Sequence, residues 1–309
     1  LSLGAEAFSS PVPPGSDSLC VLRAMRFAIE GCLKGDGLAN PQIAFADSLK
    51  RTFRDAETFR SLVKSREFQV HYQPIVHLDS RAVHHFEALT RFSGNSGPAE
   101  AIRMAEELDM IESFDLAVAE KVLKRMRQPG AGLLKMAINV SGASLGDDTY
   151  VEQLLRMTAG APEERRRLMV EVTETSAVAD IEAADRRLAA LREAGIKVCI
   201  DDFGAGAAAF DYLRKLSVDS VKIDGAIVRD IQTDQRSKAM LHSIVEMCRS
   251  MRLETIAEMI ETDGVAAELK AAGVEYGQGW LFGRAEAEPR TQLSSPSMVR
   301  RKGAVEAWG

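Results

Sequence analysis

The stretch Val198-Cys-Ile-Asp-Asp-Phe-Gly-Ala-Gly206 joins a short apolar run to a pair of adjacent aspartates and a glycine-rich turn. The apolar run predicts a buried strand, and the residues after the turn predict a helix. Acidic residues at the point where a strand gives way to a helix are typical of parallel α/β barrels, because the sites of such barrels lie at the carboxyl ends of the strands. The stretch therefore predicts the fold class and also the position of a site.

Six more short apolar runs carry a carboxylate, an amide or a lysine at or near their ends. They are Val83–Phe86 before Glu87, Met136–Ile138 before Asn139, Leu168–Val172 with Glu171 and Glu174, Val221–Ile223 with Lys222 and Asp224, Ile256–Ala257 before Glu258, and Tyr276-Gly277 before Gln278. Predicted helices separate most of the runs, at 99–108, 114–127, 148–157, 182–194, 207–215, 237–252 and 263–272. Connections of this length join parallel strands. We therefore expect an α/β fold, a (β/α)₈ TIM-like barrel with a ring of polar side chains at one mouth.

The first two predicted strands differ from the rest in how they are connected. They lie at Val70–Val76 and Val83–Phe92, and only residues 77–82 stand between them. A parallel crossover needs about a dozen residues or more, whereas an antiparallel hairpin needs only a few. We therefore expect the first strand of the barrel to run antiparallel to the others.

The ends of the chain are predicted to lie outside the barrel. Apolar residues recur at helical spacing over 19–32 and 45–68, which indicates two helices ahead of it. We expect an N-terminal segment and helical linker over 1–65, a barrel domain over 66–290 and a flexible tail over 291–309. Because the chain starts at Leu1, we also expect it to be a fragment of a longer protein.

The composition is that of an ordinary globular chain, with 309 residues of which 46% are hydrophobic. A net charge of −6 argues against DNA as a partner. No apolar run is long enough to span a membrane and no signal peptide is apparent, so we expect a cytoplasmic location with no membrane contact within this chain, while a full-length protein could be membrane-anchored. The four cysteines are scattered and give no indication of zinc.

Seven carboxylates and only two cations fall at the predicted mouth of the barrel. The carboxylates are Glu87, Glu171, Glu174, Asp201, Asp202, Glu258 and Glu261, and the cations are Arg91 and Lys222. Two cations cannot neutralise so many carboxylates, whereas divalent ions can. Mg²⁺ and Mn²⁺ prefer carboxylate, amide and water oxygens, and Asn139 supplies an amide. The sequence therefore predicts a site for Mg²⁺ or Mn²⁺.

The pair Asp201-Asp202 is suited to two ions, because one aspartate can bridge both while its neighbour binds one. The alternative is that the pair caps the following helix. Lys222 has three interpretations: a Schiff-base lysine, a lone salt bridge, or a cation that orients a nucleophilic water and stabilises phosphate charge. Nearby carboxylates raise the pKa of a lysine, which argues against the Schiff base.

Eight motifs in order over residues 66–290 resemble the EAL-domain family of bacterial cyclic di-GMP phosphodiesterases. They are Tyr72-Gln-Pro-Ile, Phe86-Glu-Ala-Leu-Thr-Arg91, Ile138-Asn-Val-Ser141, Glu171-Val-Thr-Glu174, Asp201-Asp-Phe-Gly-Ala-Gly206, Val221-Lys-Ile-Asp224, Ala257-Glu-Met-Ile-Glu261 and Gln278-Gly-Trp-Leu-Phe-Gly283. Ordered motifs are far more specific than one match. The resemblance implies a barrel with a reversed first strand and a two-metal hydrolysis of cyclic di-GMP to linear pGpG.

The resemblance also implies roles for individual residues. The first metal would be held by Glu87, Asn139, Glu171 and Asp201, and Asp201 would bridge to a second metal that Asp202 and Glu258 complete. Lys222 would assist the nucleophilic water, Glu174 would anchor the loop after Asp202, and Glu261 would support the site from behind. Gln73 and Arg91 would contact the guanine and phosphate of the substrate, with Gln278 also at the site.

Two departures from the family pattern bear on activity. The loop after Asp201-Asp202 has lost its usual hydroxyls and aromatic and reads Ala205-Gly-Ala-Ala-Ala209, and Met259 stands where the family has glycine. Both changes bear on turnover, and the Ala-rich loop favours an alternative, a catalytically weak or inactive domain that acts as a cyclic di-GMP receptor or protein-interaction module. As partners we expect a second copy, forming a homodimer through the barrel, and an upstream sensor or GGDEF-like domain, of which residues 1–65 could hold a remnant.

Overall fold

The computed structural model describes residues 18–34, 41–92, 98–173, 180–204 and 209–291. The chain divides into two compact units, one formed by Leu1–Phe68 with Phe92–Ser113 and the other by Gln69–Arg91 with Phe114–Gly309. Glu174, the loop 205–208 and residues 292–309 of the predicted tail lie outside the described residues. In the part of the chain that is described, no helix is both long and apolar enough to cross a bilayer.

The first unit contains helices α1 (Ser18–Lys34), α2 (Pro41–Ser65) and α3 (Pro98–Glu107). The two helices predicted ahead of the barrel are therefore present, with α2 beginning earlier than the sequence indicated. Phe59 of α2 packs against Phe92, with ring centroids 5.9 Å apart, and Arg26 of α1 pairs with Glu107 of α3. These contacts group the segment after the second strand with the N-terminal helices, which the sequence did not predict.

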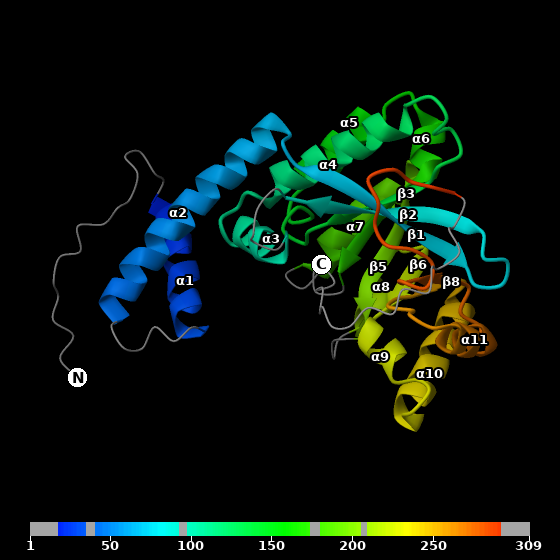
Figure 1. Cartoon of the computed structure of the whole chain (residues 1–309). Helices are drawn as coiled ribbons and strands as arrows, with labels where there is room; N and C mark the ends of the chain where they lie inside the picture. The colour runs from blue at the N-terminus through cyan, green and yellow to red at the C-terminus, as the bar shows by residue number, and fades with distance from the viewer. Residues whose placement is uncertain (1–17, 35–40, 93–97, 174–179, 205–208, 292–309) are drawn as a thin grey trace. The chain divides into compact units, whose positions relative to one another are not determined.

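The second unit is a closed eight-stranded barrel in which β1 pairs with β8 (Figure 1). The strands are β1 (Gln69–His77), β2 (Val83–Arg91), β3 (Met136–Val140), β4 (Leu168–Thr173), β5 (Lys197–Phe203), β6 (Ser220–Ile223), β7 (Glu254–Ala257) and β8 (Tyr276–Gln278). Strand β1 is antiparallel to both its neighbours, and every other pair is parallel. The predicted TIM-like barrel with a reversed first strand is confirmed.

Helices alternate with the parallel strands. They are α4 (Ile111–Met126), α5 (Thr149–Met157), α6 (Pro162–Arg167), α7 (Ile181–Glu193), α8 (Ala209–Lys215), α9 (Gly225–Arg229), α10 (Gln235–Met251) and α11 (Asp263–Ala272). Local chemistry sets several of their starts: Asp180, Asp234 and Thr262 each accept a hydrogen bond from a backbone N–H in the first turn of the helix that follows. The short helices α6 and α9 were not predicted, since one or two turns leave little periodicity to detect.

The barrel interior is layered, with apolar residues beneath polar ones. Five buried residues, Ile75, Ala137, Met169, Cys199 and Ile256, form an apolar cluster. In four strands the residue two positions further along is Asn139, Glu171, Asp201 or Glu258. Because side chains two apart share a face of a strand, each polar group stands above an apolar one. The layer below therefore closes the floor of the site and keeps water from beneath the carboxylates.

Candidate active site

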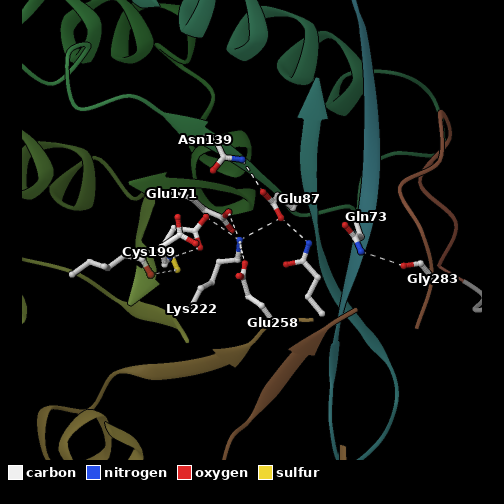
Figure 2. Close-up of polar contacts among 12 residues, drawn as sticks. Gln73, Glu87, Asn139, Glu171, Cys199, Lys222, Glu258 and Gly283 are labelled. Atoms are coloured by element: carbon white, nitrogen blue, oxygen red, sulfur yellow. Dashed lines mark hydrogen bonds and ion pairs between the residues drawn. The ribbon is translucent and has the colours of Figure 1, made fainter. Parts of the chain in front are cut away.

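The polar side chains predicted at the strand ends do meet at one mouth of the barrel (Figure 2). Strand β2 supplies Glu87, β3 Asn139, β4 Glu171, β5 Asp201 and Asp202, β6 Lys222 and β8 Gln278, while Glu258 follows the last residue of β7. Glu87 lies furthest from the end of its strand, because β2 continues for four residues beyond it, to Arg91, close to the predicted end at Phe92. The extra length of β2 leaves Glu87 buried at the level of Ala137.

A β-bulge brings the adjacent pair Asp201 and Asp202 to the same site. The register between β5 and β6 shifts between Ile200 and Phe203, and Asp202 adopts a left-handed backbone with φ of 55°. In a regular strand neighbouring side chains point to opposite faces, but a bulge re-aims one of them. Aspartate tolerates this conformation better than most residues, although it costs on the order of 1 kcal/mol. The strain accompanies a functional arrangement, in which both carboxylates face the mouth.

Lys222 lies at the centre of the site and contacts four carboxylates. Its Nζ is 2.9 Å from Glu258 Oε1, 3.0 Å from Glu171 Oε2, 3.1 Å from Asp201 Oδ2 and 3.3 Å from Glu87 Oε2. The lysine side chain is only 1% exposed. Burial opposes its charge, but the carboxylates led by Asp201 outweigh burial, so the pKa of Lys222 lies well above its ordinary value. Lys222 is therefore a cation in this arrangement, and the Schiff-base interpretation is not supported.

Glu87 is the best-satisfied carboxylate of the set. Asn139 Nδ2 donates to its Oε1 at 2.7 Å, and Gln278 Nε2 donates to its Oε2 at 2.6 Å. Burial raises the pKa of Glu87, but Lys222 and the two amide donors outweigh burial and hold the pKa below its usual value. Glu87 is therefore ionised, and the amide oxygen of Asn139 remains directed away from this bond and is available to a cation.

Lys222 alone cannot stabilise the ionised forms of all the other carboxylates. Burial, reinforced by neighbouring carboxylates, raises the pKa values of Glu171 and Asp201, and raises those of Asp202 to about 6 and Glu258 to about 8. A raised pKa means that the ionised carboxylate has too few cations and hydrogen-bond donors around it to offset its burial. A divalent cation would supply the missing partner, which agrees with the prediction from the sequence that cations belong here.

The donor atoms present fit divalent metal ions. Two sets of carboxylates offer ligand oxygens within 4.8 Å of one another, Glu87 with Glu171 and Asp201, and Asp201 with Asp202 and Glu258. Asp201 belongs to both sets, as a bridging ligand must. Two buried oxygens of the site, Glu171 Oε1 and Gln278 Oε1, have no hydrogen-bond partner among the described residues. Buried orphan oxygens are costly, and hard-cation coordination would satisfy them.

The remaining predicted residues lie further from this centre. Gln73 is buried on β1 and donates to the backbone oxygen of Gly283 at 3.3 Å, turned away from Lys222 (Figure 2). Arg91, at the end of β2, donates to the backbone oxygen of Thr90. Glu261 is exposed and belongs to neither carboxylate set described above. The roles assigned to these residues, and to Glu174 outside the described residues, stay predictions.

Met259 is a feature whose structural role the sequence did not reveal. It follows Glu258 directly and has a left-handed backbone, with φ of 53°. Its side chain lies over Gly225, where a Cβ on the glycine would approach Met259 Cγ to 2.5 Å and Met259 Cβ to 3.0 Å. The lack of a side chain at Gly225 therefore leaves room for Met259, whose side chain packs against the glycine. The departure from the family pattern at 259 was visible in the sequence, but its compensation at 225 was not.

The raised pKa of Glu258 predicts that stability depends on pH. Its pKa rises from 4.5 to about 8 on folding, mainly through burial. Between these values the folded protein binds a proton that the unfolded chain lacks, so stability falls as pH rises. We expect Glu258→Gln to reduce this slope by up to about 1.4 kcal/mol per pH unit in the presence of a chelator. Urea unfolding of the wild-type protein and of Glu258→Gln from pH 5 to 8.5 measures the slope of the unfolding free energy against pH. Equal slopes in the two proteins would contradict a raised pKa for Glu258.

The reversed first strand and the carboxylate sets sharing Asp201 define the class of protein: a TIM-like barrel with a candidate divalent-cation site at the carboxyl ends of its strands. The family model described as "EAL domain" matches residues 56–285, and the chain belongs to this family. The family predicted from the motifs is therefore confirmed.

Named relatives and a solved structure agree with this assignment. The chain is 32% identical over 235 residues to the cyclic di-GMP phosphodiesterase NbdA of Pseudomonas aeruginosa, covering 74% of this chain and 30% of that protein. It is 31% identical to the cyclic di-GMP phosphodiesterase PdeB of Shewanella oneidensis, covering 72% and 27%. The PaMucR phosphodiesterase in complex with c-di-GMP superposes with a TM-score of 0.69 at 27% identity, over 75% of this chain and 97% of that one. The chain thus spans less than a third of the length of these two curated relatives.

Proposed function

We propose that this protein is a metal-dependent phosphodiesterase that hydrolyses cyclic di-GMP to linear pGpG. The observation that carries the proposal is the pair of carboxylate sets that share Asp201 around the buried ammonium of Lys222. Relatives named as cyclic di-GMP phosphodiesterases, and a structural neighbour in complex with c-di-GMP, support the choice of substrate. In the reaction, water adds to phosphorus, the bond from phosphorus to the 3′ oxygen breaks, and that oxygen takes up a proton.

We assign one metal position to Glu87, Asn139, Glu171 and Asp201 and a second to Asp201, Asp202 and Glu258. Two Mg²⁺ or Mn²⁺ ions there would act as Lewis acids toward the phosphate and the attacking water. Lys222, as a cation, orients the water and offsets negative charge on phosphorus-bound oxygens. The apolar layer beneath excludes water from the floor and strengthens these electrostatic effects. Gln73, Arg91 and Gln278 are proposed to position the substrate, with Glu174 and Glu261 supporting the loops.

The wider organisation of the protein is also a proposal. The barrel domain would cover residues 66–290, preceded by a helical linker and followed by a tail over 291–309. A homodimer through the barrel and an upstream sensor or GGDEF-like domain would regulate it, in the cytoplasm. This chain matches less than a third of the length of the two curated relatives, which supports the proposal of further domains.

The direct test is incubation with cyclic di-GMP and Mn²⁺, with pGpG followed by chromatography. We expect product formation that a chelator abolishes and that Mn²⁺ or Mg²⁺ restores. Binding of cyclic di-GMP by calorimetry should be run in parallel, in Ca²⁺. Tight binding without product under any metal would replace the phosphodiesterase with the receptor that the Ala205–Ala209 loop favours. If the protein neither binds cyclic di-GMP nor forms pGpG, cyclic di-GMP is not its substrate.

A further inference from the structure

The ammonium of Lys222 contacts the same carboxylates that the proposed metal ions need. Its Nζ is within 3.3 Å of one oxygen on each of Glu87, Glu171 and Asp201, which together make up the first carboxylate set. It is also 2.9 Å from Glu258, which belongs to the second set. Figure 2 shows Glu87, Glu171 and Glu258 converging on the end of the lysine side chain. The lysine therefore lies where the two sets meet.

A divalent ion and the ammonium of Lys222 would compete for Glu87, Glu171 and Asp201, because an ion at the first set needs an oxygen from each residue that Nζ contacts. Mg²⁺ lies about 2.0–2.1 Å from its oxygen ligands and demands near-octahedral geometry around itself. Nζ is 3.0–3.3 Å from one oxygen of each residue of the first set, so an ion that drew an oxygen from all three into its shell would come close to Nζ. Charge opposes coexistence too, because like charges a few ångströms apart repel strongly in a buried, low-dielectric site.

We propose that Lys222 is a displaceable internal counter-ion: metal binding drives its ammonium away from Glu171 and Asp201 and frees it for the substrate phosphate. The inference rests on the proposed function, since it concerns the same metal site. Without such a counter-ion the four carboxylates would face one another with no charge to offset them, and their mutual repulsion would destabilise the barrel mouth. With it, the site stays folded, and the lysine becomes available to the substrate only when the metal ions are in place.

The side chain has the properties that this exchange needs. Lysine carries its charge on a flexible four-carbon stem, so Nζ can move by several ångströms without a change in the backbone. In the metal-free arrangement the neighbouring carboxylates outweigh burial and raise its pKa well above the ordinary value, so an incoming metal ion would meet a charged lysine. Displacement therefore moves a positive charge rather than a neutral amine.

Lys222→Met tests the competition, because methionine preserves much of the length and volume while removing the charge. We expect the dissociation constant of Mn²⁺, measured by calorimetry without substrate, to fall at least about tenfold, as the ion no longer displaces a buried cation. The matched control is Lys197→Met. Lys197 lies on the neighbouring strand β5, pairs with Glu254 at 2.9 Å and is 41% exposed. Solvent screens its charge, so its removal should change the constant by less than about twofold.

A crystal structure of the wild-type protein with Mn²⁺ tests the displacement itself and does not depend on any variant folding. We expect anomalous density at the carboxylates and Lys222 Nζ more than about 4 Å from Glu171 Oε2 and Asp201 Oδ2. Mn²⁺ bound with Nζ still within 3.3 Å of both oxygens would overturn the inference, as would Mn²⁺ binding equal or weaker in Lys222→Met. In both cases the proposed function would stand, whereas a wild-type protein that binds no Mn²⁺ would overturn both.

Discussion

Replacement of Asp201 by asparagine should abolish metal-dependent turnover. Asp201 is the residue common to both carboxylate sets, so its loss weakens both proposed metal positions at once. Loss of even an outer partner of a metal site costs about 10–100-fold in affinity or activity. We therefore expect the rate of pGpG formation to fall by at least about a hundredfold. The Mn²⁺ isotherm should lose both binding events, measured by calorimetry without substrate.

Two comparison variants make this result specific to the site. Asp202→Asn should weaken one Mn²⁺ event and leave the other, because Asp202 belongs to one set. Asp263→Asn changes the same type of residue at the first position of α11, where the side chain is 82% exposed and pairs with Arg81. It should retain wild-type activity and metal binding. An Asp201→Asn protein that keeps more than a tenth of the wild-type rate would contradict a bridging role.

Replacement of Gly225 by alanine should destabilise the barrel, against the usual trend for a glycine at the start of a helix. Alanine is normally favoured over glycine in a helix by about 1 kcal/mol. Here its Cβ would approach Met259 Cγ to 2.5 Å and Cβ to 3.0 Å, so the methionine cannot yield by rotating only its end. Overpacking of this kind typically costs about 1–3 kcal/mol. Urea unfolding should show a lower free energy of unfolding.

The double variant Gly225→Ala with Met259→Gly tests whether the two positions form one packing unit. Glycine at 259 removes the clash and also suits the left-handed backbone found there. We expect it to recover most of the stability lost in the single alanine variant, with a coupling free energy of about 1–3 kcal/mol. Gly132→Ala is the matched control, since no atom lies within 4 Å of the added Cβ. Additive effects at 225 and 259 would show that the methionine moves aside freely.

The strand order and the reversed hairpin could be predicted because both depend on local features of the chain. Apolar runs of strand length are visible without any tertiary contact, and the six residues between the first two strands are too few for a crossover. The candidate ligands followed for the same reason, as each stands at or near the end of its own run. Parallel topology brings those ends together, so no long-range information was needed to group Glu171, Asp201 and Glu258.

The grouping of residues 92–113 with the N-terminal helices could not be predicted in this way. Strand β2 ends at Arg91, and Phe92 then packs against Phe59 and Phe68. Each of these aromatic residues is apolar in any fold, and the sequence does not say which hydrophobic surface it will join. Contacts between residues more than twenty positions apart decide the matter, and periodicity carries no record of them.

By itself, the sequence determined a barrel with a reversed first strand and an excess of carboxylates at one mouth, because connection lengths, apolar runs and charge counts are properties of the chain alone. Only the tertiary structure decided how those groups meet. A bulge in β5 turns Asp202 toward the mouth, Gly225 makes room for Met259, and Lys222 contacts four carboxylates from four different segments. Each of these three arrangements depends on the packing of segments that are distant in the chain. Burial and close approach then set the geometry of the groups and the strength of the electrostatic interactions between them.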